Sequence, residues 1–267
     1  MRPNILLLSI LILTFTGCTP QKTKVPEGNE VIMGIFGGMG PEATADLYKQ
    51  VLDITPATND QEHIPAIIFS NPKVPDRMES IANGGEFIKP YLGFSIQKLE
   101  QAGASFIAIP CNTVHYFYDF MSESVEIPII HMIRETAAEV AEKYPGAKKV
   151  GLLATTGTIE TGLYNWELEK KGYDVITPSD SILMNMVMKA VYGIKSKTEP
   201  KLNEDLLAAA GHHLAERGAE VIVLGCTEIP LAYNPDRVDL PVVNATKVLA
   251  EKSVETYNNM IEKRGER

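Results

Sequence analysis

Two cysteines stand in matching sequence contexts, and their types and positions could place two thiols in one site. Residues 103–116 read GASFIAIPCNTVHY, and residues 218–231 read GAEVIVLGCTEIPL. Each segment begins with Gly-Ala, continues with an apolar run typical of a buried parallel strand, and reaches a cysteine eight residues after its glycine. Cys111 and Cys226 therefore end two predicted strands, at the edge where open α/β sheets bind ligands.

Two thiols on opposite sides of a carbon atom could invert its configuration. One thiolate would remove a proton from one face while the other thiol donates a proton to the opposite face. A helix amino terminus or a neighbouring cation can lower the pKa of a thiol from about 8.5 towards neutrality. Each cysteine precedes a polar residue and a predicted helix start, so we expect this environment for both, and the reaction would need no cofactor and no metal. The alternative is a disulfide, which an oxidising compartment favours.

The two cysteine segments belong to a longer internal repeat. Gly34 and Gly151 begin similar strand-turn-helix segments, and the residues 127–130 (IPII) are echoed by 240–243 (LPVV). The spacing between the copies drifts slowly, from 117 to 115 to 113 residues. We therefore predict an α/β fold of two similar lobes, each a parallel sheet flanked by helices. Pseudo-two-fold symmetry would relate the lobes, with the active site between them.

Apolar periodicity predicts the elements that would position the site. We expect the first lobe at 30–131, completed by a C-terminal helix at 245–264, and the second lobe at 132–244. The predicted strands are 30–36, 64–70, 106–109, 126–131, 150–154, 173–176 and the runs that end at Cys226 and near Val243. The predicted helices are 41–52, 87–103, a short one from Thr113, 132–144, 180–195 and 202–217.

Two cations could hold an anionic ligand near these strand ends. Arg77 leaves the second predicted strand in the loop 71–77 and should face the same crevice as Cys111. Lys195 ends a Met-rich predicted helix in the second lobe. Each has a plainer interpretation, because Arg77 could be a solvated loop arginine and Lys195 could offset the helix dipole.

Two further features near the strand ends, a glycine-rich turn and a histidine, could have either a functional or a structural role. The turn 37–41, GGMGP, precedes a predicted helix and would let the backbone approach a small carboxylate. It lacks the glycine spacing of a dinucleotide-binding motif and the lysine of a phosphate loop. His115 lies within two turns of Cys111, and we interpret it as a capping or packing residue because no second histidine or aspartate stands at triad-like spacing.

The amino terminus has the features of an export signal. Residues 1–4 form a short basic start, residues 5–15 are an apolar run of eleven, and Thr16-Gly17-Cys18 is a small-residue site ending in cysteine. This apolar run is too short to span a bilayer. The segment 1–17 resembles a bacterial lipoprotein signal, with Cys18 lipidated and 18–29 as a flexible tether. A plain secretory signal and a misassigned start codon are the alternatives.

Composition narrows the possible partners. The chain has 267 residues, a formal net charge of −9 at pH 7 and no basic run. We therefore expect no nucleic-acid partner, and contact with a membrane only through the lipid anchor in the cell envelope or periplasm. The expected ligand is a small molecule, and the expected assembly is a homodimer.

Four motifs resemble those of the cofactor-independent aspartate/glutamate racemases, most closely the aspartate racemase branch. They are GIFGGMGPEAT at 34–44, PKVPDR at 72–77, PCNT at 110–113 and GCTE at 225–228, and the resemblance covers roughly residues 31–255. It implies that the two cysteines are the paired acid and base, one for each enantiomer. Glutamate racemases carry a histidine at the position of Glu228, which favours the aspartate branch. The family is usually cytoplasmic, so the predicted signal is a departure.

The resemblance also implies a set of substrate-binding residues. Arg77 and Lys195 would bind the substrate carboxylates, while side chains and backbone N–H groups would hold the α-carboxylate and α-amino group. The full expected binding set is Met39, Arg77, Asn112, Thr113, Val114, Lys195 and Thr227. We expect a racemase for an acidic amino acid, foremost aspartate. The alternatives are a lipid-anchored protein that binds such an amino acid without turnover, and a decarboxylase or isomerase that uses one cysteine.

Overall fold

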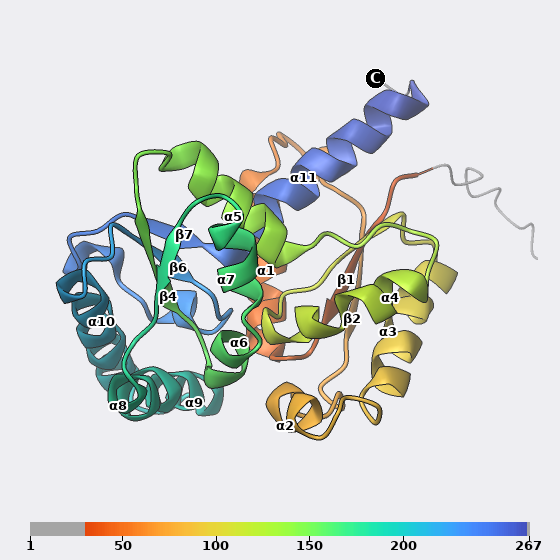
Figure 1. Cartoon of the computed structure of the whole chain (residues 1–267). Helices are drawn as coiled ribbons and strands as arrows, with labels where there is room; N and C mark the ends of the chain where they lie inside the picture. Colours follow the sequence, from red (N-terminus) through yellow and green to blue (C-terminus); the bar gives the residue numbers. More distant parts are fainter. Residues whose placement is uncertain (1–29, 266–267) are drawn as a thin grey trace, which may run out of the picture. The chain divides into compact units, whose positions relative to one another are not determined.

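Two parallel β-sheets organise the protein, whose computed structural model describes residues 30–265 (Figure 1). The first sheet has the order β2-β1-β3 and contains β1 (Met33–Gly37), β2 (Ala66–Ser70) and β3 (Phe106–Ala108). The second sheet has the order β5-β4-β6-β7 and contains β4 (Lys149–Leu153), β5 (Asp174–Ile176), β6 (Val221–Leu224) and β7 (Val242–Asn244). All strand pairs are parallel. The predicted α/β fold with two parallel sheets is confirmed, and the first three strands of each sheet share one order.

Helices cover both faces of each sheet, because apolar side chains alternate across the strands. In β1, Phe36 packs on the α3 side, whereas Met33 and Ile35 pack with α1 and α11. The helices before β4 are α1 (Pro41–Ile54), α2 (Arg77–Ala82), α3 (Lys89–Gln101), α4 (Tyr118–Glu123) and α5 (Met132–Lys143). Those after β4 are α6 (Thr156–Glu160), α7 (Leu163–Glu169), α8 (Asp180–Ile182), α9 (Lys189–Ser196), α10 (Pro200–Glu216) and α11 (Ala245–Arg264). A π-helical turn, Leu183–Met188, joins α8 to α9 within the predicted helix 180–195.

The predicted strand 126–131 is wrong, because this segment makes a single bridge between Ile129 and Ile107. Its counterpart in the second sheet is the complete strand β7. The segment pairs with β3 only through Ile107, whose N–H donates to Pro128 O and whose carbonyl accepts the N–H of Ile130, each at 2.9 Å. In the second sheet, pairing continues over all three residues of β7.

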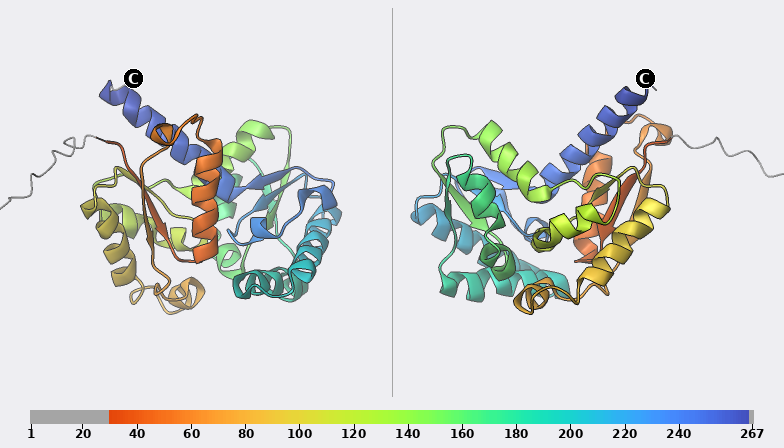
Figure 2. Two further views of the ribbon diagram at one scale, coloured as in Figure 1. Left: turned by 180° about the vertical axis from the view of Figure 1, so that it is seen from behind. Right: turned by 45° about the vertical axis from the view of Figure 1, so that its right-hand side comes forward.

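The last helix packs on the first lobe although it follows the second in sequence. Its residues Leu249, Ala250 and Val254 lie in the same buried cluster as Met33 and Leu47. Figure 2 shows α11 leaving the second sheet and passing beside α1. The lobe boundaries stay a prediction, since the chain from Val31 onward forms one compact unit.

The amino-terminal predictions concern another part of the chain. The predicted signal, the tether and Cys18 all lie outside the described residues. Within residues 30–265, no helix is both long enough and apolar enough to cross a bilayer.

A glycine turn fixes the start of α1 near the strand ends. Gly38 has a φ of +97° and donates its N–H to Thr44 Oγ1 at 2.9 Å, and Thr44 Oγ1 donates to Gly40 O at 2.9 Å. A Cβ on Gly38 would lie 2.4 Å from the carbonyl carbon of Asn71. The turn therefore requires glycine for both its backbone conformation and its contact with the loop after β2.

Two buried histidines support the segment that carries Cys111. His115 Nδ1 lies 2.8 Å from Cys111 O, and the Met132 N–H donates to His115 Nε2 at 3.2 Å. His115 therefore carries its hydrogen on Nδ1 and bonds the backbone through both nitrogens, as a packing residue. His131 Nδ1 accepts the N–H of Arg134 and caps α5. Burial lowers the pKa of both histidines, and for His131 the nearby His115 and Arg134 lower the pKa further, to about 3.

We expect Gly38→Ala to destabilise the protein more than Gly84→Ala. Both glycines have a positive φ, but a Cβ on Gly84 has no atom within 4 Å. Gly84→Ala should cost about 1 kcal/mol from backbone strain, and Gly38→Ala at least about 2 kcal/mol more because of the clash. Urea unfolding measures both losses. Equal losses would show that the contact with Asn71 adjusts freely.

We expect acid to destabilise the protein through His131. The unfolded state has a histidine pKa of about 6.5 and the folded state about 3, so the unfolded state binds more protons between these values. Stability should therefore fall as the pH falls through this window. Asn is a good helix cap, so His131→Asn should keep α5 capped and reduce the fall in melting temperature between about pH 6.5 and pH 4. His212→Asn, at an exposed position, is the control. An unaltered pH dependence in His131→Asn would contradict this assignment.

Candidate active site

A cavity of about 40 Å³ lies among the loops that follow the carboxyl ends of the strands. We call it the inner cavity. From the first lobe it is lined by Met39, Asp76, Arg77, Met78, Cys111, Asn112 and Thr113. From the second lobe it is lined by Thr155, Thr158, Met188, Val191, Tyr192, Lys195, Cys226, Thr227 and Glu228. The two cysteines are free thiols that each expose only 5–6% of their surface.

Most of the binding residues expected from the sequence line this cavity, and Val114 does not. Val114 is fully buried in the apolar core of the first lobe, with Cys111 and Phe117 in the same cluster. It follows Thr113 in a short 3-10 helix, Thr113–Phe117, so the two side chains point in different directions. The Val114 side chain therefore does not line the cavity, and a contact of its backbone with a ligand stays a prediction.

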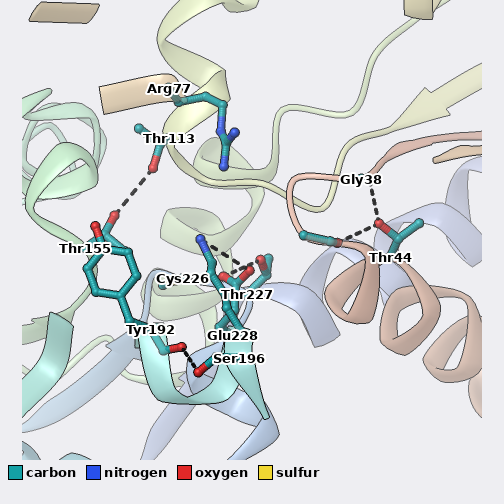
Figure 3. Close-up of polar contacts among 12 residues, drawn as sticks. Gly38, Thr44, Arg77, Thr113, Thr155, Tyr192, Ser196, Cys226, Thr227 and Glu228 are labelled. Atoms are coloured by element: carbon teal, nitrogen blue, oxygen red, sulfur yellow. Dashed lines mark hydrogen bonds and ion pairs between the residues drawn. The ribbon is translucent and has the colours of Figure 1, made fainter. Parts of the chain in front are cut away.

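Arg77 directs a guanidinium with unused donors into the cavity (Figure 3). It begins α2 and does not lie in a loop as predicted, because Asp76 caps the helix by accepting the N–H groups of Met78 and Glu79 at 2.9 and 3.0 Å. Arg77 Nη1 donates to Pro75 O at 3.2 Å, while its buried Nε has no partner among the described residues. The cap, Asp76 followed by Glu79, was visible in the sequence as a helix-start pattern.

Side-chain hydrogen bonds join the lobes beside the cavity. Thr113 Oγ1 lies 2.8 Å from Thr158 Oγ1 and 3.5 Å from Thr155 Oγ1. The Tyr164 hydroxyl donates to Asn112 Oδ1 at 2.7 Å, which orients the amide. Asn112 Nδ2 is buried and has no partner within the described part of the chain. The amide is therefore fixed with its donor group available to an acceptor.

Glu228 is the site residue whose role the sequence did not reveal. It exposes 4% of its surface, and the Cys226 thiol donates to its Oε2 at 3.1 Å. Its Oε1 lies 3.8 Å from Lys195 Nζ, and a Cβ on Gly40 would approach the same oxygen to 3.0 Å. Figure 3 shows Glu228 beside Cys226 and Thr227. In the sequence, the only indication of this contact was the position of Glu228 two residues after Cys226.

The environment of Cys226 is the reverse of what the sequence led us to expect. Burial raises the pKa of the Cys226 thiol well above its usual range, and the charge of Glu228 raises it further. The backbone N–H of Glu228 and the charge of Lys195 lower the pKa of Cys226, and Lys195 has the weakest of these effects. Tyr164 also faces Cys226, and burial raises the pKa of its phenol. These effects favour the thiol form of Cys226 over the thiolate.

A larger hollow of about 470 Å³, which we call the outer chamber, adjoins the inner cavity. The two spaces share Met39, Arg77, Lys195 and Glu228. At its rim, Lys197 Nζ pairs with Glu42 Oε2 at 2.6 Å, between the end of α9 and the start of α1. The inner cavity has room for about three water molecules, less than an amino acid needs. A ligand of that size would therefore extend towards the outer chamber or displace the walls.

This arrangement suits proton transfer on a small anionic molecule. Two thiols from different lobes line one space, and unpaired donors on Arg77 and Asn112 adjoin it. No group of three or more His, Cys, Asp and Glu side chains is arranged to hold a metal ion within residues 30–265.

Comparison with known proteins identifies the family. A family model described as Asp/Glu/Hydantoin racemase matches residues 36–252. The broad specificity amino-acid racemase RacX of Bacillus subtilis is 27% identical over 230 residues, which cover 85% of this chain and 98% of that protein.

Solved structures agree with this match. The aspartate racemase of Picrophilus torridus superposes with a TM-score of 0.76 at 27% identity, covering 85% of this chain and 94% of that one. A glutamate racemase from Francisella tularensis, in complex with D-glutamate, shares the fold with a TM-score of 0.62 at 19% identity, covering 87% of this chain and 83% of that one. The chain belongs to the Asp/Glu/hydantoin racemase family, and its activity class is amino-acid racemisation.

Proposed function

We propose that the protein interconverts the L- and D-forms of an acidic amino acid, foremost aspartate, by proton transfer between Cα and two cysteines. The observation that carries this proposal is that Cys111 and Cys226, from different lobes, line one small cavity. Relatives named as an aspartate racemase and as a broad specificity racemase support the reaction class. The choice of an acidic substrate rests on Arg77 and Lys195, two cationic side chains that line this cavity.

In the proposed reaction, the thiolate of one cysteine takes the proton from Cα while the thiol of the other gives a proton to the opposite face. The roles exchange for the other enantiomer, so each turnover moves one proton from one sulfur to the other. This chemistry draws on no pyridoxal phosphate and no metal, since both acid and base are side chains. A one-cysteine decarboxylase or isomerase would leave the second buried thiol without a role.

Arg77 and Lys195 would neutralise the substrate carboxylates. Both line the inner cavity and the outer chamber, at the boundary that a substrate side chain would cross. A guanidinium presents a planar pair of donors that matches a carboxylate. The Asn112 Nδ2, oriented by Tyr164, would donate to the α-carboxylate, and Thr113 and Thr227 offer hydroxyls to the same end.

The cellular setting is a separate part of the proposal and concerns residues outside the described range. We propose that Cys18 is lipidated and anchors the protein in the cell envelope, and that the enzyme works as a homodimer. Mass spectrometry of the membrane fraction should find a lipidated Cys18, and light scattering should give twice the monomer mass. A soluble protein that retains residues 1–17 would contradict the anchor.

We expect both cysteines to be required for racemisation. Cys111→Ala and Cys226→Ala should each lower the rate by at least about 100-fold, because each removes an acid or a base. In D₂O, the native enzyme should incorporate deuterium at Cα of both L- and D-aspartate, and chelator should leave the rate unchanged. Ser181→Ala, an exposed position, is the control. Saturable binding of aspartate without any exchange would instead favour a binding protein.

We expect Arg77 to recognise the side-chain carboxylate. Arg77→Leu should lower kcat/KM for aspartate by roughly tenfold to 100-fold more than for alanine, since alanine lacks the second carboxylate. Arg77→Lys should recover part of the loss, and Arg237→Leu, which removes an arginine from a surface ion pair, should have little effect. Equal losses for aspartate and alanine would make Arg77 a structural residue.

A further inference from the structure

We propose that Glu228 is a positioning residue that retains the proton on Cys226, which makes Cys226 the acid and Cys111 the base of the resting enzyme. This inference rests on the proposed two-cysteine reaction and adds which cysteine is the acid when the enzyme is at rest. The two cysteines would not be equivalent, although they lie at equivalent positions of the repeat.

The contact geometry supplies the first step of the argument. The Cys226 thiol donates to Glu228 Oε2 at 3.1 Å, and the carboxylate exposes 4% of its surface. A carboxylate accepts hydrogen bonds and repels a second negative charge in a buried site. Thr227 Oγ1 also lies 3.4 Å from Oε2, so the oxygen that holds the thiol is itself held in place.

The other charged and titratable groups around Cys226 do not outweigh this contact. Lys195 on α9 is the nearest cation, and its Nζ lies 3.8 Å from Oε1 of Glu228. Tyr164 on α7 is neutral and donates to Asn112. On the first lobe, Arg77 reaches the cavity, while Asp76 uses its carboxylate to cap α2. Burial and the charge of Glu228 raise the pKa of Cys226, and the backbone N–H of Glu228 and the charge of Lys195 only partly oppose them.

Cys111 lacks an equivalent carboxylate. Its thiol makes no hydrogen bond to any residue in the range 30–265, and the residue two positions after it is Thr113. Its backbone carbonyl is held by His115, which burial keeps neutral by lowering its pKa. The two cysteines therefore occupy equivalent places in the repeat but different electrostatic environments.

The asymmetry has a consequence for the reaction. One enantiomer would meet the resting form directly, with Cys111 taking the Cα proton and Cys226 giving its own. This leaves a thiol on Cys111 and a thiolate beside Glu228, and proton exchange with water restores the resting form. Since the two enantiomers have equal free energy, their kcat/KM values stay equal, and the asymmetry would appear in kcat and KM separately.

Thiol alkylation with iodoacetamide tests this assignment without requiring turnover. Peptide mass spectrometry would follow the modification of each cysteine as a function of pH, with each curve scaled to its own high-pH plateau. In the native enzyme, Cys111 should react at lower pH than Cys226. In Glu228→Gln, the Cys226 midpoint should fall by at least about one pH unit, because an adjacent charge has been removed. The Cys111 midpoint should move less.

Three further variants make the result specific. Glu228→Asp keeps the charge and should restore the high Cys226 midpoint. Lys195→Met removes the nearby cation and should raise that midpoint, which provides a test if Glu228→Gln does not fold. Glu204→Gln removes a carboxylate on α10 that pairs with Lys201, outside the cavity, and should change neither curve. Where racemisation is measured, Glu228→Gln should bring the KM values of the two enantiomers closer together.

The possible outcomes separate this inference from the proposed function. A Cys226 midpoint that stays in place or rises in folded Glu228→Gln would overturn the role of Glu228, whatever the activity. So would a native enzyme in which Cys226 reacts at lower pH than Cys111. If the midpoints behave as expected but no acidic amino acid is racemised, the retention of the proton stands and the proposed function fails.

Discussion

A buried carboxylate has to be matched by partners, because an isolated charge out of water costs several kcal/mol. Glu228 meets this requirement only in part: the Cys226 thiol and the Thr227 hydroxyl donate to its Oε2, whereas its buried Oε1 has no hydrogen-bond partner among the described residues and lies 3.8 Å from Lys195 Nζ. The site depends on this cluster, since it determines which sulfur carries a hydrogen and how much of the Lys195 charge remains for a ligand. Its Oε1 also lies against Gly40, where a side chain would collide with it.

The duplicated strands explain why the thiols come together, and small differences between the copies explain why they are not equivalent. Gly34 packs against Ala104 in one lobe as Gly151 packs against Ala219 in the other, and a Cβ added to either glycine would lie 3.0 Å from the alanine Cβ. By contrast, Pro110 precedes Cys111, whereas Gly225 precedes Cys226 and donates its N–H to Leu153 O. The backbone scaffold is thus repeated, while the residues next to each cysteine have diverged.

Much of this arrangement could be predicted from the sequence, because the ends of strands and the buried faces of helices produce apolar patterns over a few residues. The positions of Cys111, Cys226 and Arg77 could be placed at one edge from apolar runs and the order of elements alone. The pKa of Cys226 could not, since it depends on a carboxylate orientation that no local pattern encodes. The sequence suggested activation by a helix start, and the backbone N–H of Glu228 does lower the pKa of Cys226, but burial and the charge of the Glu228 side chain outweigh it.

Other differences between the predicted and the observed structure also have local causes. The segment 126–131 has a strand-like apolar pattern, but it pairs with its neighbour β3, which ends at Ala108, only through the bridge at Ile107. Val114 sits within a motif of binding residues, but the turn of a 3-10 helix directs it into the core. Motif membership therefore identified the segment correctly and could not resolve the direction of each side chain.

The packing of α11 limits how the chain can be assembled. The core that contains Met33 and Leu47 is closed by Leu249, Ala250 and Val254, at the opposite end of the described chain. During synthesis, the first sheet emerges from the ribosome long before the helix that covers it, so its apolar face stays uncovered until α11 has been made. An isolated amino-terminal half would present that face to water, because the helix that covers it follows the second sheet in sequence.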